Sequence, residues 1–161
     1  MFFLPNRRQI ACVLIGLPLA LGRPAMAPGQ ETKQPLYHRL GGVYAIATVV
    51  DDFIERLLVN EVLNANPAIS AARASVPKAG LKYRVTELVC QVTGGPCQYT
   101  GRSMKDSHQH LHITEAEWRA MAADFKLTLD RFKVPTAEQN ELFAIVESVK
   151  PQIVMQGSAP R

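Results

Sequence analysis

The sequence predicts an all-α protein with one domain, and three observations lead to this fold class. In four long segments the apolar residues recur at steps of three and four, which is the period of an amphipathic helix. No segment sustains the two-residue alternation that is typical of a half-buried strand. Clusters of Gly and Pro separate the helical segments, and a chain of 161 residues that is 47% hydrophobic can form one core.

The first long helix is predicted at residues 43–59. It follows a single helical turn at 36–40 and a Gly-Gly break. Its apolar stripe consists of Val43, Ile46, Val49, Val50, Phe53, Ile54, Leu57 and Leu58. Asn and Pro interrupt residues 60–77, so we expect only a short helix there, at 69–74.

The second long helix is predicted at residues 78–92, where one side is apolar. A Gly-Gly-Pro sequence at 94–96 ends it, because glycine accepts the left-handed backbone of a helix C-terminus and proline cannot continue the helix. A loop follows, and then a short helix is expected at 103–111.

Two capping boxes predict the starts of the last two helices. Thr114 with Glu117 opens a helix that we expect to end at the next Val-Pro pair. Thr136 with Gln139 forms a similar pair and is expected to open the final helix. That helix is expected to end at the Lys-Pro sequence of residues 150–151.

Residues 1–27 have the pattern of an export signal. Arg7 and Arg8 precede an apolar stretch at 10–21, and the segment ends in Ala-Met-Ala, which a signal peptidase can recognise. Pro28 lies directly after that sequence and disfavours cleavage there. Cleavage elsewhere in the segment and an uncleaved anchor therefore both stay open, and we expect an exported, periplasmic protein.

The net charge of +4 arises mainly from this leader. Residues 1–27 carry three arginines and no acid, so 15 basic and 14 acidic residues remain in the rest of the chain. That balance does not support binding to nucleic acid or to an anionic membrane. No later segment approaches the roughly 20 apolar residues of a membrane span. The remainder divides into a linker at 28–35, a domain at 36–153 and a flexible tail at 154–161.

Two cysteines remain beyond the leader, Cys90 and Cys97. In an oxidising compartment they can form a disulfide across the intervening turn. A buried Cys90 and a free loop thiol at Cys97 agree equally well with the sequence, because pairing depends on geometry. The sequence has no Cys-x-x-Cys pair or thiolate cluster that would indicate a metal site.

Three histidines follow one another at spacing two, His108, His110 and His112. On a helix, His108 and His112 would share a face, and that spacing can hold zinc or nickel. A solvated cationic helix end is the other interpretation. The sequence contains neither a Gly-rich phosphate loop nor a nucleophile elbow. The residues alone therefore indicate an exported helical domain with a candidate histidine site.

Three segments together form a more specific signature. They are Leu-Tyr-His-Arg-Leu-Gly-Gly at 36–42, Val-Val-Asp-Asp-Phe at 49–53, and the run from Gly-Gly-Pro through Tyr-Thr-Gly-Arg-Ser-Met-Lys to His108. Their order and spacing resemble those of the group I truncated haemoglobins, over roughly residues 36–153. The resemblance implies a two-over-two helical sandwich around haem b, with His108 as the proximal iron ligand.

The resemblance also implies a set of further haem contacts. The expected residues are Phe53, Ile54, Leu81, Arg84, Val85, Tyr99, Met104, Leu111 and Trp118. Arg84 is expected near a haem propionate. For the apolar members a plain core role is the alternative, since core residues line haem pockets.

The distal side departs from the family pattern. Family members commonly have Tyr directly after the equivalent of Phe53, and here that position is Ile54. A polar residue is also common at the position of Val85. We therefore expect an apolar distal pocket that lacks a hydrogen-bond donor for a gas ligand. Lys82 and Tyr83, on the same predicted helix, stay open as alternative iron ligands.

These observations predict a haem protein that binds oxygen, nitric oxide or carbon monoxide. Oxygen transport, nitric oxide dioxygenation and a peroxidase-like redox role are all compatible with the residues. The last two need an electron-transfer partner, because this sequence contains no flavin or nicotinamide domain. The competing hypothesis is a cofactor-free helical binding module on a globin scaffold.

Overall fold

The structure is a computed structural model of the chain and describes residues 33–154. These residues belong to one compact unit that begins at Lys33. The predicted signal at 1–27, most of the linker and most of the tail lie outside the described residues and stay predictions. Within the described range every regular element is helical, and the only β feature is one isolated bridge between Ile113 and Val154. The predicted all-α class is confirmed.

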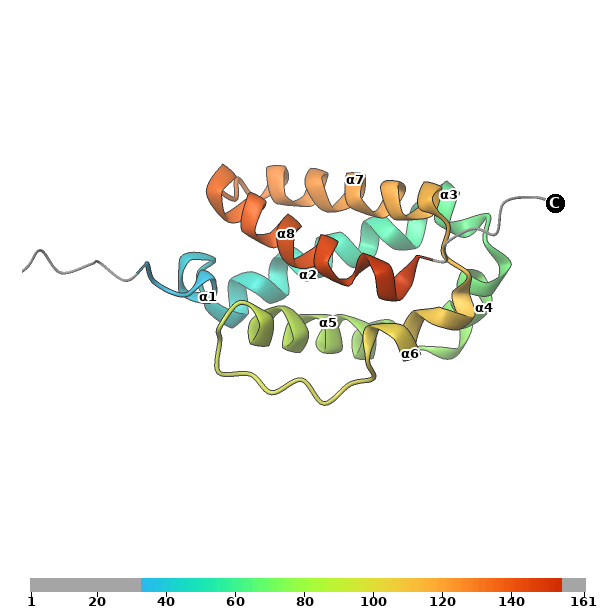
Figure 1. The fold of residues 1–161 in the computed structure, drawn as a ribbon, viewed down its shortest axis with the longest axis horizontal. Helices are drawn as coiled ribbons and strands as arrows, with labels where there is room; N and C mark the ends of the chain where they lie inside the picture. Colours follow the sequence, from blue (N-terminus) through green and yellow to red (C-terminus); the bar gives the residue numbers. More distant parts are fainter. Residues whose placement is uncertain (1–32, 155–161) are drawn as a thin grey trace, which may run out of the picture. The chain divides into compact units, whose positions relative to one another are not determined.

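The described residues form eight α-helices and one 3₁₀ helix. In chain order they are α1 (Leu36–Arg39), α2 (Gly42–Val59), α3 (Glu61–Asn64), α4 (Pro67–Ser75), α5 (Lys78–Val92), α6 (Met104–His108), η1 (Gln109–Leu111), α7 (Glu115–Arg131) and α8 (Thr136–Ile153). Helix α2 packs against both α5 and α7, and α6 packs against α8 (Figure 1). None of the described helices combines the length and apolarity that crossing a bilayer requires.

Three buried clusters hold these helices together. One joins α2 to α5, the second joins α1, α7 and α8, and the third joins α3 and α4 to the segment after η1. Their buried members are, in the same order, Ile46, Val50, Ile54 and Cys90; Leu36, Leu129 and Leu142; and Leu63, Ile69 and Ile113. The helical pairs α2–α5 and α7–α8 therefore each have an apolar seam of their own.

The asparagines that suggested an irregular connection in fact start two helices. The Asn60 side chain accepts a hydrogen bond from the Leu63 amide and caps α3, a helix that was not predicted. The Asn66 side chain accepts bonds from the first amides of α4, which has Pro67 at its first position. Helix α4 is accordingly longer than the predicted 69–74.

The first predicted capping box is confirmed and the second is wrong. Thr114 Oγ1 accepts from the Glu117 amide, and the Glu117 carboxylate accepts from the Thr114 amide, at 3.3 and 2.6 Å. At the start of α8 the cap position is Pro135, with no side-chain bond. Gln139 instead donates to Asp130 Oδ1 and Val134 O, at 3.1 and 2.9 Å, because it is buried against the end of α7.

The predicted end of the last helix at residues 150–151 is also wrong. Helix α8 continues through Pro151 to Ile153, and the Val154 amide still donates to Lys150 O at 2.9 Å. Proline removes only its own amide donor, so the helix loses one bond near its end and the next turn still forms. In contrast, α5 has the predicted bounds, and α2 begins one residue before the predicted start.

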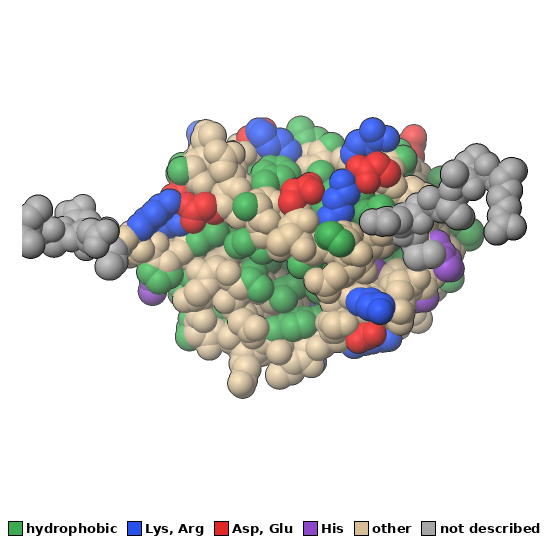
Figure 2. Space-filling model, viewed as in Figure 1, with side chains coloured by type: hydrophobic (Ala, Val, Ile, Leu, Met, Phe, Trp, Pro, Cys, Tyr) green, Lys and Arg blue, Asp and Glu red, His purple; other side chains and the backbone are tan. Residues whose placement is uncertain are grey.

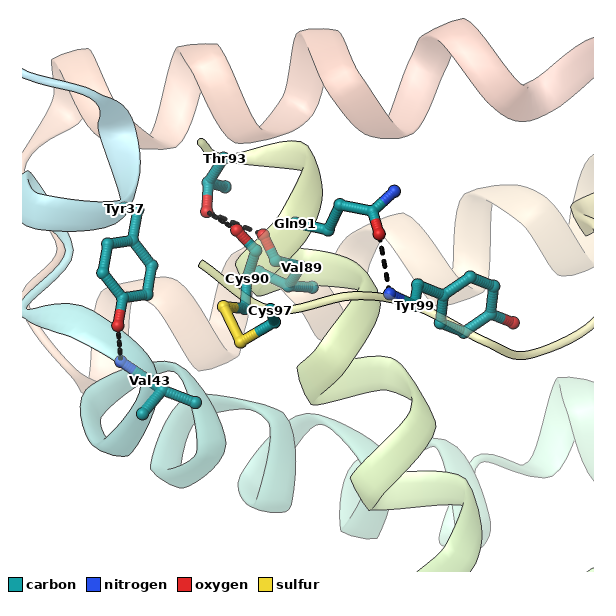
Figure 3. The surroundings of a disulfide bond; sticks show 8 residues. All are labelled: Tyr37, Val43, Val89, Cys90, Gln91, Thr93, Cys97 and Tyr99. Atoms are coloured by element: carbon teal, nitrogen blue, oxygen red, sulfur yellow. Dashed lines mark hydrogen bonds between the residues drawn. A yellow bond between two sulfur atoms is a disulfide. The ribbon is translucent and has the colours of Figure 1, made fainter. Parts of the chain in front are cut away.

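A disulfide connects the last turn of α5 to the following loop (Figure 3). Cys90 and Cys97 are bonded, with Cα atoms 5.7 Å apart, so the free-thiol interpretation of Cys97 is wrong. The loop is held further by Gln91 Oε1, which accepts from the Tyr99 amide at 2.6 Å. The turn needs glycine at Gly95, where a Cβ atom would come within 2.4 Å of the Tyr37 ring.

Candidate functional site

A cavity of about 1510 Å³ lies within the helical domain. Its walls come mainly from apolar side chains of α2, α5, α7 and α8. Hydrophobic side chains are visible at the surface between α8 and α5 in the space-filling view (Figure 2). Ordinary small-molecule pockets measure roughly 300–1,000 Å³, so this cavity has room for a large apolar group.

His108 lines this cavity at the end of α6. Ser103 caps the start of the helix, and its Oγ accepts from the Asp106 amide at 3.0 Å. His108 Nδ1 donates to the Met104 carbonyl oxygen at 2.8 Å, which leaves Nε2 with its lone pair. Burial lowers the pKa of the imidazole below its ordinary value, so the ring is neutral. A half-buried, neutral and oriented imidazole can act as a metal ligand.

The predicted shared helical face of His108 and His112 is wrong. Helix α6 ends at His108, His110 lies in η1, and His112 has a left-handed backbone with φ of 52°. No group of three or more His, Cys, Asp or Glu suited to a metal ion occurs among residues 33–154. The structure therefore lacks the shared helix face of His108 and His112 on which a zinc or nickel site would depend.

All the other predicted contact residues line the same cavity. They are Phe53, Ile54, Leu81, Arg84, Val85, Tyr99, Met104, Leu111 and Trp118. Residues from α2, α5, the loop after α5, α6, η1 and α7 thus converge on one space, although their individual roles toward a cofactor stay predictions. The alternative of a plain core also describes part of the set, since Ile54 and Trp118 are both only 3% exposed.

The wall formed by α2 and α5 is almost wholly apolar. Among the residues of these two helices that line the cavity, only Lys78 and Arg84 have polar side chains. Lys82 and Tyr83 are not cavity-lining residues. The Lys82 ammonium group is paired with Asp51 and Glu55, and the hydrogen bonds that it donates to those carboxylates raise its pKa, so it stays charged. Tyr83 is 60% exposed.

Polar side chains gather at the rim, where the α5–α6 loop meets α5. Arg84 Nη1 donates to Thr100 Oγ1 at 2.6 Å and to Glu87 at 2.8 Å. The Tyr99 hydroxyl donates to Arg102 O at 2.8 Å, and Arg102 also lines the cavity. Guanidinium groups at this rim can pair with the carboxylates of an amphipathic ligand. Thr100 and Arg102 belong to the signature run before His108, but neither was among the expected haem contacts.

Two further polar residues that contact the chain just beyond His108 were also missed. Glu117 lines the cavity although it is only 7% exposed. Asn66 donates from Nδ2 to Leu111 O at 2.9 Å, three residues beyond His108. The capping pattern did identify Glu117 as a helix-start residue, but no local signal shows that its carboxylate faces the interior.

A model of the bacterial-like globins matches residues 35–155. The chain belongs to this family. Two curated relatives are group 1 truncated hemoglobins. The one from Mycolicibacterium paratuberculosis is 30% identical over 118 residues, which is 73% of this globin and 82% of the relative. The one from Synechocystis sp. is 32% identical over 104 residues, 62% of this globin and 79% of the relative.

Solved structures agree with this classification. Truncated hemoglobin from Tetrahymena pyriformis in the Fe(III) form matches with a TM-score of 0.67 at 21% identity, over 76% of this globin and 100% of that chain. The 2/2 hemoglobin of Synechococcus sp. PCC 7002, in the cyanomet state with covalently attached heme, matches with a TM-score of 0.63 at 28% identity. The match covers 72% of this globin and 93% of that chain. This globin is a group I truncated haemoglobin with the predicted two-over-two fold.

Membership of the family implies haem, and the donor set of the cavity fits that group. A haem needs apolar walls, a nitrogen ligand for its iron and cations near its propionates. The cavity of this globin offers apolar faces on α2, α5, α7 and α8. It also offers the neutral imidazole of His108 and, at its rim, Arg84 and Arg102.

Proposed function

We propose that this globin holds haem b through His108 and binds a diatomic gas against the apolar wall of α2 and α5. The observation that carries the proposal is the imidazole of His108, which is oriented by Met104 O and lines an otherwise mainly apolar cavity. When bound, the haem iron would supply the coordination site for oxygen, nitric oxide or carbon monoxide.

The side chains around the cavity would orient the ligand, bind the propionates and exclude water. The hydrogen bond from His108 Nδ1 to Met104 O fixes the tautomer and makes Nε2 a more basic ligand for the iron. Arg84 and Arg102 would hold the haem propionates at the rim, where water still reaches them. The apolar faces of α2 and α5 would exclude water from the gas side.

The gas side lacks the donor that would stabilise polar ligands. Ile54 belongs to the apolar cluster that joins α2 to α5, and Val85 packs against the same cluster. A hydrogen bond to a charged or strongly polarised partner contributes roughly 1.5–3 kcal/mol. Without it, oxygen should leave quickly, whereas carbon monoxide depends less on such a donor. This supports transient gas handling or redox chemistry, with an electron-transfer partner, over oxygen storage.

Replacing Ile54 with tyrosine is expected to slow oxygen dissociation by about tenfold or more, because the new hydroxyl can donate a hydrogen bond to oxygen. Ile54→Phe is the matched control, since it adds the same ring without the hydroxyl. Flash photolysis and stopped-flow mixing measure the rates, and carbon monoxide dissociation should change less. Equal oxygen off-rates in the two variants would show that residue 54 does not face the gas.

The haem proposal is tested by titrating the purified protein with haem and recording the visible spectrum. We expect a Soret band at one equivalent that shifts on reduction and again on addition of carbon monoxide. A protein that forms no stable haem complex would instead be the cofactor-free binding module of the competing hypothesis.

We propose in addition that the protein is exported to the periplasm. Two observations support this location, the signal-like pattern of residues 1–27 and the disulfide between Cys90 and Cys97. Disulfides persist in oxidising compartments and are rare in the cytosol. The intact mass of protein recovered from a periplasmic fraction tests export and locates the cleavage site. Full-length protein confined to the cytosol would contradict the proposal.

A further inference from the structure

Residues 104–113, here called the proximal segment, have little regular structure of their own. They comprise the five residues of α6, the three of η1, His112 with its left-handed backbone, and Ile113. A helix this short does not keep its shape by itself, because its few internal hydrogen bonds do not offset the cost of nucleation. Neighbouring elements must therefore determine where the His108 ring lies.

The Asn66 side chain makes one of the contacts that fix this segment. Asn66 is the N-cap of α4, where its Oδ1 accepts from the amides of Ala68 and Ile69 at 2.9 and 3.3 Å. Its Nδ2 donates to Leu111 O at 2.9 Å. One amide group thus links the capped start of α4 to the backbone three residues beyond His108.

Other contacts hold the far end of the proximal segment, where it meets α7. Glu117 Oε2 accepts from the Thr114 amide and hydroxyl at 2.6 and 2.7 Å. Burial raises the pKa of the Glu117 carboxyl, but hydrogen bonds from Thr114 and Asn66 outweigh burial, so the net direction is downward and the group is charged. Ile113 anchors the end of the segment in the apolar cluster with Leu63.

We propose that Asn66 is a positioning residue of the haem site, which acts through Leu111 O to set where the His108 imidazole meets the iron. The inference rests on the proposed role of His108. Loss of the Asn66 amide donor leaves the cap of α4 intact but frees the backbone on one side of the ligand. The iron–histidine bond should then become weaker and more variable, and haem should leave faster.

The decisive substitution is Asn66→Asp, because aspartate caps a helix as well as asparagine does but cannot donate to Leu111 O. In the haem-loaded ferrous protein, the iron–histidine stretching band in the resonance Raman spectrum should move to lower frequency and broaden. Haem transfer to apomyoglobin should accelerate about tenfold. In the haem-free protein, amide hydrogen exchange across the proximal segment should also accelerate.

Asn60→Asp is the matched control, because Asn60 also caps a helix through Oδ1 and donates a hydrogen bond from Nδ2. Asn60 caps α3 through Oδ1 and donates from Nδ2 to Asp124 Oδ2 at 2.6 Å, so its loss disturbs α7 but not the proximal segment. The Asn60 variant should lose stability without a change in the Raman band. In the Asn66→Asp variant the new carboxylate could also repel that of Glu117. A double variant, Asn66→Asp with Glu117→Gln, removes this repulsion but not the loss of the hydrogen bond to Leu111 O, so its iron–histidine band should stay shifted.

The outcomes distinguish this inference from the proposed function. An Asn66 variant with the band and exchange rates of the unmutated protein would overturn the positioning role, as would equal effects in the Asn60 variant. Full recovery in the double variant would also overturn it, since repulsion would then explain the effect. If the unmutated haem complex shows no iron–histidine band, the proposed role of His108 is wrong, and the positioning role of Asn66 is then wrong as well.

Discussion

Replacing His108 with glycine is expected to weaken haem retention by more than roughly 100-fold. Loss of a partner that merely orients a ligand already costs 10–100-fold in metal affinity, and this substitution removes the ligand itself. Imidazole added to the solution should occupy the space left by the side chain and restore the spectrum of a histidine-ligated haem. The measurement is a haem titration by Soret absorbance, with and without imidazole.

His112→Gly is the appropriate control for that experiment. His112 is exposed, lies four residues away and has a left-handed backbone that glycine adopts without strain. This variant should bind haem like the unmutated protein. Equal haem retention in the His108 variant would place the iron ligand elsewhere.

Reducing the disulfide between Cys90 and Cys97 is expected to lower the free energy of unfolding of the haem-free protein by roughly 2–3 kcal/mol. The bond closes a short loop, with a sequence separation of 7, and so removes conformational freedom from the unfolded chain. Urea unfolding followed by circular dichroism, with and without a dithiol reductant at fixed pH, measures the difference.

Cys97→Ser provides the control, because it leaves the fully buried Cys90 thiol in its apolar cluster. Its stability should equal that of the reduced protein and should not respond to reductant. If alkylation shows complete reduction of the unmutated protein while its unfolding midpoint is unchanged, the bond does not stabilise the fold.

Local signals in the sequence predicted most of the helices. Helix α5 has the predicted bounds because its apolar period and the Gly-Gly-Pro stop both act within a few residues. The pairing of Thr114 with Glu117 is likewise local. The second capping box failed because tertiary contacts compete for the same side chain. Burial against α7 gives Gln139 the partners Asp130 and Val134, and they replace the local bond.

The candidate site was predicted by a different route. Periodicity placed Phe53 and Ile54 on an inward helix face, but it did not distinguish a cofactor pocket from an ordinary core. Their assignment to a haem site, and the choice of His108 among three histidines, came from the resemblance to truncated haemoglobins. No pattern indicated that Asn66 contacts the proximal segment, because the hydrogen bond between its amide and Leu111 O spans 45 positions of the chain.

The sequence by itself therefore determined the helices and their main boundaries, and the resemblance to truncated haemoglobins added a predicted list of haem contacts. Helical period, caps and Gly-Pro stops depend on interactions between residues a few positions apart, so a short stretch of sequence is enough to recognise them. Only the tertiary structure decided that Cys90 pairs with Cys97, that His108 and His112 do not share a face, and that Glu117 and Asn66 lie beside the proximal segment. Those contacts depend on how distant helices pack, and packing is a property of the whole domain.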